Sequence, residues 1–176
     1  MNAGAVSCFA EVIMDLHLHS YPHLRLPDWS AAATAGFAAG AVVMVLEFFW
    51  SILAYGTSPW AISHLIAAIV MGPAVLQSNE FSVAVVTVAL LAHYALGIVF
   101  GLLLAFAIAS LSLDSSVGMV SVAGMVFGAT LYLLNFHGMT HFFPWFINLR
   151  GTETLWIHLI FGVTAALLYW KLNRRA

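Results

Sequence analysis

Two histidines four residues apart lie among aromatic side chains in the stretch NFHGMTHFFPWF, residues 135–146 of an otherwise apolar chain. An imidazole ring is costly to bury unless its nitrogen atoms find partners. If this stretch is helical, His137 and His141 lie on one face of the helix. Imidazole and carboxylate groups together suit iron, copper or zinc. The first candidate for chemistry is therefore a transition-metal site that includes this pair.

Further polar side chains in the apolar part of the chain could complete that site. The expected additional ligands are Glu47, His64 and His158. Asn135 and Glu153 are expected to hydrogen bond to the ligating rings and to orient them. A His-x-x-x-His pair without the glutamate of a zinc-protease helix does not indicate a reaction. The alternative interpretation is an interfacial pair of rings that hydrogen bond to loop carbonyl groups and water.

Two other kinds of chemistry use some of the same residues. His93 and His158 are each followed by a glycine four residues later, which suits b haem ligands where the macrocycle lies flat. Counted from the inner, cytoplasmic ends of their expected helices, however, His93 lies about 6 residues further out than His158. At 1.5 Å per residue this is a difference in depth of roughly 9 Å. This difference argues against pairing them as haem ligands. Alternatively, Glu47 and His93 could relay protons within the membrane.

Composition places the chain in a membrane. Of its 176 residues, 63% are hydrophobic and 7% are charged, and the mean hydropathy is +1.01. Soluble domains carry roughly 25% charged residues. The single cysteine, Cys8, excludes an intrachain disulfide and a thiolate metal cluster. The sequence has no basic patch or nucleic-acid-binding motif, so nucleic acid is not an expected partner.

Four stretches are long and apolar enough to cross a bilayer, which takes about 20 residues each. We expect them to be helical, because lipid offers no partner to an unpaired backbone group. The short link SLDSS, at 112–116, makes the second and third spans an antiparallel hairpin. The expected spans are 31–55, 82–111, 117–136 and 154–170.

The segment PWAISHLIAAIVMGPAVL, at 59–76, is apolar but short, and its run ends at Gly72-Pro73. Such a run fits a re-entrant or interfacial helix better than a fifth span. Four spans also place both termini on one side of the membrane.

The basic residues set the expected orientation. Arg25 precedes the first span and Lys171, Arg174 and Arg175 follow the last, whereas Arg150 alone falls in a loop on the other side. Under the positive-inside rule, both termini are cytoplasmic and the protein is a multi-pass protein of the inner membrane. This orientation puts the polar groups of the spans in the outer half of the bundle.

Helical spacing places several of these polar groups on faces suited to helix packing. Small residues four positions apart let helix backbones approach closely. Three spans combine such residues with a polar group on one face. These faces are Gly36, Gly40 and Glu47; His93, Gly97 and Gly101; and His158, Gly162 and Ala166.

A faint internal repeat runs along the chain. The words AG, PW and HLI occur in that order in both halves. They begin at residues 39, 59 and 64 in the first half and at 123, 144 and 158 in the second. This order suggests a duplicated hairpin of the kind found in small transporters.

Residues 1–29 are expected to form an N-terminal arm, and residues 30–176 the transmembrane bundle. In the arm, apolar residues recur at helical spacing from Val6 to Met14 without a basic face. This pattern favours a short amphipathic helix that binds a partner protein rather than lipid. The run HLHSYPH, at 17–23, is interpreted as a solvated linker or, alternatively, a separate metal site.

The sequence thus predicts an all-α, polytopic membrane bundle of four transmembrane helices, with a re-entrant or interfacial helix and an amphipathic arm. Its expected partners are the lipid bilayer and other membrane protein subunits. The predicted function is that of a subunit in a larger respiratory or other redox assembly, with iron, copper or zinc bound in the outer half of the bundle. The alternatives are an electron-transfer subunit that binds haem b, a structural accessory subunit, and a small proton- or ion-conducting protein or transporter.

Overall fold

The computed structural model describes residues 26–55 and 58–174, which form helices and connecting turns without a strand. The long helices are α2 (Trp29–Tyr55), α4 (Val83–Ser110), α5 (Val117–Leu133) and α6 (Thr152–Asn173). They match the four expected spans to within a few residues, so the predicted fold class is confirmed. The expected amphipathic helix and the run at 17–23 lie outside the described residues.

All four long helices have the length and composition to cross a membrane. The candidate spans are 22 to 28 residues long, and α5 reaches 25 residues with the turns that continue it to His141. A hydrocarbon core of about 30 Å requires about 20 residues of helix. Two of the helix starts are capped by a side chain. The backbone N–H of Ala31 donates to Asp28 Oδ1, and that of Met119 donates to Ser116 Oγ.

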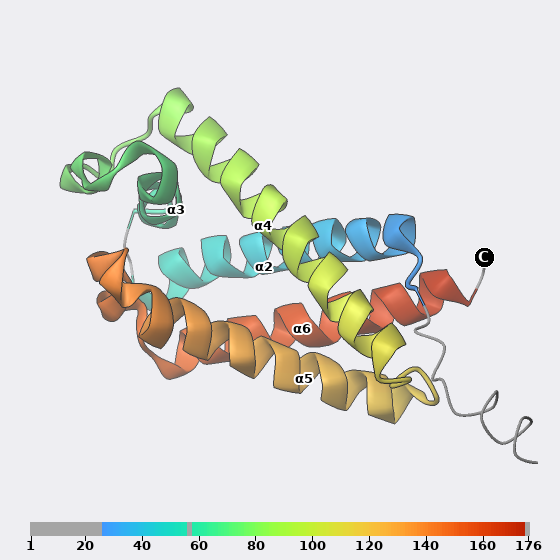
Figure 1. Ribbon diagram of the computed structural model, residues 1–176. Coiled ribbons are helices and arrows are strands. Elements are labelled where there is room, and N and C mark those ends of the chain that lie inside the picture. Colours follow the sequence, from blue (N-terminus) through green and yellow to red (C-terminus); the bar gives the residue numbers. More distant parts are fainter. Residues whose placement is uncertain (1–25, 56–57, 175–176) are drawn as a thin grey trace, which may run out of the picture.

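α2 begins and α6 ends at the same end of the bundle (Figure 1). This end is termed the terminal end, and the opposite end, which carries residues 58–82 and 134–151, is termed the loop end. The arrangement follows from the even number of long helices. Which end faces the cytoplasm stays a prediction from the basic residues.

Short helical elements build the loop end. They are α3 (Ala61–Met71), η1 (Pro73–Gln77), η2 (Leu134–Gly138), η3 (Met139–His141) and η4 (Pro144–Leu149). With 11 residues, α3 is roughly 16 Å long and too short to cross a bilayer. It ends where Gly72 adopts a φ of +86°, in the left-handed region that favours glycine, and Pro73 follows without an N–H.

The long helices pack as two pairs, α2 with α4 and α5 with α6, and within each pair the backbones touch. The glycine contacts are Gly36 with Gly97 and Gly101, Gly124 with Gly162, and Gly128 with the backbone of His158. At most of these positions an added β-carbon would overlap a backbone atom of the facing helix. The faces of small residues predicted from the sequence are therefore the packing faces.

The two pairs are built alike, but the residues that correspond between them differ from those aligned by the words AG, PW and HLI. Ala-Gly-x-x-x-Gly-Ala occurs at 35–41 in α2 and at 123–129 in α5. In the second helix of each pair, His93-x-x-x-Gly97 corresponds to His158-x-x-x-Gly162. The first glycine of each α2 or α5 motif lies against the glycine of the partner motif. We infer two similar helical hairpins, α2–α4 and α5–α6.

Burial follows the same register. The buried equivalents are Ala32 and Val120, Val43 and Leu131, and Leu104 and Tyr169. Continued towards the loop end, the register aligns Glu47-Phe48 with Asn135-Phe136. The expected alignment through the words HLI paired His64 with His158. The packing contradicts it, because His64 lies on α3 and the counterpart of His158 is His93.

The hairpins meet mainly along α2 and α6. α4 crosses the bundle at an angle and departs from α5 towards the loop end (Figure 1). The link at 112–116 predicted that the second and third spans form an antiparallel hairpin. The corresponding helices, α4 and α5, do run in opposite directions, but they barely pack against each other. The glycine contacts provide each of these helices with a closer partner.

Most of the buried apolar core lies near the terminal end. Its members there include Ala32, Ala35, Ala105, Ile108 and Val120, each exposed by 1% or less. A second, smaller cluster joins α3 to α4 through Ala67, Val85 and Ala89. The polar candidates of the sequence analysis lie outside the main cluster, in the half of the bundle near the loop end.

Replacing Gly101 by Ala should lower the stability of the folded protein by about 1–3 kcal/mol, the usual cost of overpacking. The new methyl group would lie 2.6 Å from Gly36 Cα and 2.8 Å from Ala32 O, and backbone atoms cannot move aside cheaply. The measurement is the thermal unfolding midpoint of purified protein in detergent. Gly118→Ala is the matched control, since its nearest neighbour would be Ser116 Oγ at 3.9 Å. Equal midpoints for both variants would contradict the close approach of α2 and α4.

Candidate functional site

The predicted metal ligands lie in the half of the bundle near the loop end, but they do not converge. Within residues 26–55 and 58–174, no group of three or more His, Cys, Asp or Glu side chains is placed to hold a metal ion. Metal binding therefore stays a prediction. Each candidate residue has surroundings of its own, which decide what its side chain can do.

His64 is 4% exposed and ties α3 to the segment that follows it. Its Nδ1 lies 2.6 Å from the carbonyl oxygen of Val75, and its Nε2 lies 2.9 Å from that of Glu80. A neutral imidazole has one N–H and donates to one carbonyl, so only the doubly protonated ring donates to both. His64 would have to give up one of these contacts to bind a metal ion.

His93 lies on the packing face of the first hairpin, as its spacing predicts. Its Nε2 donates to the carbonyl oxygen of Gly40 on α2, at 2.9 Å. An added β-carbon at Gly40 would lie 3.6 Å from Nε2, an ordinary van der Waals contact, so the ring does not require a glycine there. The edge of the His93 ring packs against Tyr94. The hydrogen bond joins α4 to α2, and Nε2 would have to leave it to ligate a haem iron.

His158 and Asn135 are in contact, as expected for a ring and the residue that orients it. Nδ1 of His158 donates to the carbonyl oxygen of Thr154 at 2.8 Å, and Nε2 faces Nδ2 of Asn135 at 3.4 Å. Phe136 packs edge-on to the ring, with 5.3 Å between ring centroids. Protein partners thus occupy both nitrogen atoms of His158.

The chain leaves the α-helical geometry between His137 and His141, so the condition for a shared face is not met. Leu134–Gly138 form a π-helical turn and Met139–His141 a 3₁₀ turn. Both histidines are exposed at the loop end. The ring of His137 packs against Tyr132, and that of His141 packs against Phe142.

Arg150 holds this irregular turn together, a role that the sequence analysis did not predict. Its Nε donates to the carbonyl oxygen of Phe136 at 2.6 Å, and its Nη2 donates to Thr140 Oγ1 at 3.4 Å. Basic side chains commonly satisfy the carbonyl groups left free at a helix C-terminus. Arg150 and Phe136 are 14 residues apart in the sequence, so no local pattern indicated this contact.

Glu47 lies on the same face of α2 as Gly36, Gly40 and Val43, which is the face that packs within the bundle. It is eight residues before the end of α2, roughly 12 Å along the helix axis. The side chain is partly buried and has no hydrogen bond or ion pair with another described residue. An ionisable group at this depth is a functional candidate by default.

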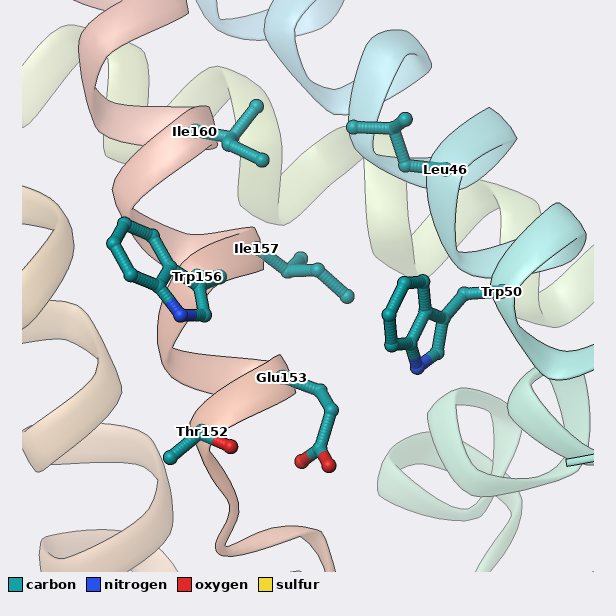
Figure 2. A pocket seen from close by; sticks show the side chains of 7 residues that line it. All are labelled: Leu46, Trp50, Thr152, Glu153, Trp156, Ile157 and Ile160. Carbon is teal, nitrogen blue, oxygen red and sulfur yellow. The ribbon is translucent and has the colours of Figure 1, made fainter. Parts of the chain in front are cut away.

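A pocket of about 490 Å³ opens between α2 and α6 near the loop end (Figure 2). Its lining residues are Leu46, Trp50, Thr152, Glu153, Trp156, Ile157 and Ile160. The carboxylate of Glu153 extends from the first turn of α6 towards the side of α2 (Figure 2). Glu153 therefore faces a cavity, and not the histidine rings that it was expected to orient.

The sequence analysis missed the pocket, although part of it has a sequence signal. The residues that line it from α6 lie at positions 153, 156, 157 and 160, which is the spacing of one helical face. Leu46 and Trp50, the facing wall, lie far away in the sequence. Nothing in the local pattern connects them to α6.

No protein-family model, curated protein or solved structure matches this chain. The class of the protein therefore rests on its own fold. It is an all-helical, multi-pass membrane protein with four candidate membrane-spanning helices, in contact with lipid.

Replacing His64 by Ala should loosen the segment after α3 without unfolding the bundle. The change removes the ring that donates a hydrogen bond to the carbonyl group of Val75 or of Glu80, at about 1–3 kcal/mol where water does not reach that group. Amide hydrogen exchange in residues 72–81 should rise at least about tenfold, the equivalent of roughly 1.4 kcal/mol. His137→Ala, at an exposed ring, should leave that exchange unchanged. If a chelator reproduces the effect on wild-type protein, His64 acts through a metal ion instead.

Proposed function

We propose that this protein is a small membrane transporter, in which two hairpins move against each other and Glu47 carries a proton or a small cation. The supporting observation is the Glu47 carboxyl group, on the packed face of a candidate span and without a partner among the described residues. Charged side chains are costly inside a bilayer, and they mark ion and proton pathways.

The duplicated architecture supports the same proposal. α2 and α5 run from the terminal end to the loop end, and α4 and α6 return, so the hairpins are parallel repeats. Several transporter folds consist of such repeats and bind their substrates between them. Glu47 and Asn135 occupy equivalent positions in the two hairpins. One hairpin thus carries a titratable group where the other carries a neutral amide.

The packing favours a carrier over an open pore. Among the described residues, the core near the terminal end is apolar, and residues such as Ala105, Ile108 and Val120 are fully buried there. An ion at Glu47 therefore needs a rearrangement to reach that side. Backbone contacts make each hairpin stiff, whereas the hairpins meet mainly along α2 and α6. Movement at this boundary would alternate access to Glu47.

Glu47→Gln should abolish proton movement by the protein reconstituted in liposomes. The amide keeps the size of the side chain but can neither release a proton nor neutralise a cation. The measurement is the fluorescence of an enclosed pH dye under a potassium diffusion potential, and the rate should fall at least about tenfold, to that of empty liposomes. Glu80→Gln, at an exposed carboxylate outside the spans, should keep the wild-type rate. A wild-type rate equal to that of empty liposomes would refute proton transport, and an unchanged rate in Glu47→Gln would refute the role of Glu47.

A second candidate function is the one first expected from the sequence, a subunit of a larger membrane assembly. Its support is α4, whose apolar stretch is less buried within the chain than that of α2, with shares of 17% and 28%. This leaves a long face of α4 for lipid or for another subunit. In such an assembly, His137 and His141 are the histidines of the described part of the chain whose exposed rings can share a metal ion with a partner.

The assembly proposal predicts metal in the native complex. Isolated in mild detergent, the complex should contain iron, copper or zinc in fixed proportion to this chain, and a Soret absorption band would identify haem. His137→Ala and His141→Ala should each remove most of a shared ion, because a ligand set acts as a unit. Asn135→Ala should weaken binding less, by roughly 10- to 100-fold. Unchanged metal content in the histidine variants would exclude these ligands.

A further inference from the structure

The pocket between α2 and α6 changes in chemistry along its length. Leu46 and Ile160 lie at one end, Trp50 and Ile157 face each other in the middle, and Glu153 lies at the other end, near the first turn of α6 (Figure 2). Both helices are candidate spans, so the apolar end lies deeper in the bilayer and the carboxylate lies near its surface. An amphiphile in a bilayer has the same order of groups.

The pocket is open on its lipid side. Trp50 is 49% exposed and Trp156 is 64% exposed, while Leu46 and Ile160 are also well exposed. At about 490 Å³, its volume lies within the 300–1,000 Å³ typical of small-molecule sites. A ligand dissolved in the membrane can therefore enter sideways, without crossing the packed seams of the hairpins.

The charge of the lining selects the kind of ligand. Among the residues that the structure describes, Glu153 is the one ionisable residue in the lining, and no Lys, Arg or His accompanies it there. A carboxylate close to indole rings favours a cation, because the faces of Trp rings attract positive charge. The described lining has no cationic side chain to pair with the phosphate of a zwitterionic lipid or with another anion.

We propose that this pocket binds a lipophilic cation. The charged group of the ligand lies between the Glu153 carboxylate and Trp50, and its apolar body fills the space beside Leu46, Ile157 and Ile160. The proposal does not depend on the transport role of Glu47, which does not line the pocket.

Two probes of nearly equal size and shape but opposite charge test the proposal. Tetraphenylphosphonium is a lipophilic cation, and tetraphenylborate is the corresponding anion. Radiolabelled probe is dialysed to equilibrium against the purified full chain in dodecyl maltoside, and binding to protein-free micelles is subtracted. The wild-type chain should bind about one cation per chain saturably and should show no saturable binding of the anion.

Variants assign the binding to this pocket. Glu153→Gln should weaken binding of the cation roughly tenfold, and Trp50→Leu roughly fivefold, as expected for a partly exposed ion pair and a cation–π contact. Trp29→Leu is the matched control, since Trp29 is 48% exposed at the other end of the same helix, and it should bind like wild type. Glu47→Gln should also bind like wild type, which separates this site from the transport proposal. Equal saturable binding of both probes, or an unchanged affinity in Glu153→Gln, would overturn the proposal.

Discussion

Direct contact between helix backbones is the constraint on which the rest of this structure depends. Within a membrane, helices gain little from hiding apolar side chains from lipid, so close packing must hold them together. Gly36 against Gly97 and Gly101 provides that packing in one hairpin, and Gly124 against Gly162 provides it in the other. These contacts determine which long helix packs against which. They also bring His93 close enough to α2 to donate a hydrogen bond to the carbonyl oxygen of Gly40.

The histidines show how an apolar bundle accommodates polar rings. His64, His93 and His158 each lie within hydrogen-bonding distance of backbone carbonyl groups, and Asn135 approaches the second nitrogen of His158. Such bonds offset the cost of taking imidazole out of water. They also orient each ring towards the protein. Among the histidines that the structure describes, His137 and His141 are exposed, and they lie where the α-helix ends and irregular turns begin.

The features with functional potential lie where the packing is looser. Each hairpin is closed by glycine contacts, whereas α4 departs from α5 and the two hairpins meet mainly along α2 and α6. Glu47 and the pocket of Trp50 and Glu153 both lie on the loop-end half of α2, close to this boundary. In transporters built from repeats, the substrate binds at the boundary between the repeats. The same boundary leaves room for a ligand that arrives through the bilayer.

The sequence by itself determined the properties that depend on local composition and spacing. Hydropathy located the four spans, and residues three and four positions apart identified the faces of Gly36 and Gly40, of His93 and Gly97, and of His158 and Gly162. Only the tertiary structure decided which face meets which. The link at 112–116 suggested that α4 packs on α5, yet backbone fit assigned α4 to α2.

The same distinction applies to the candidate site. Spacing could place His137 and His141 on one face only for a regular helix, and the π-helical turn at Leu134–Gly138 removed that condition. The partners of His64 are backbone carbonyl groups, which carry no sequence signature. Trp50 and Glu153 line one pocket although they belong to different hairpins. Helical periodicity describes one helix at a time, whereas a site between helices depends on how closely their backbones approach.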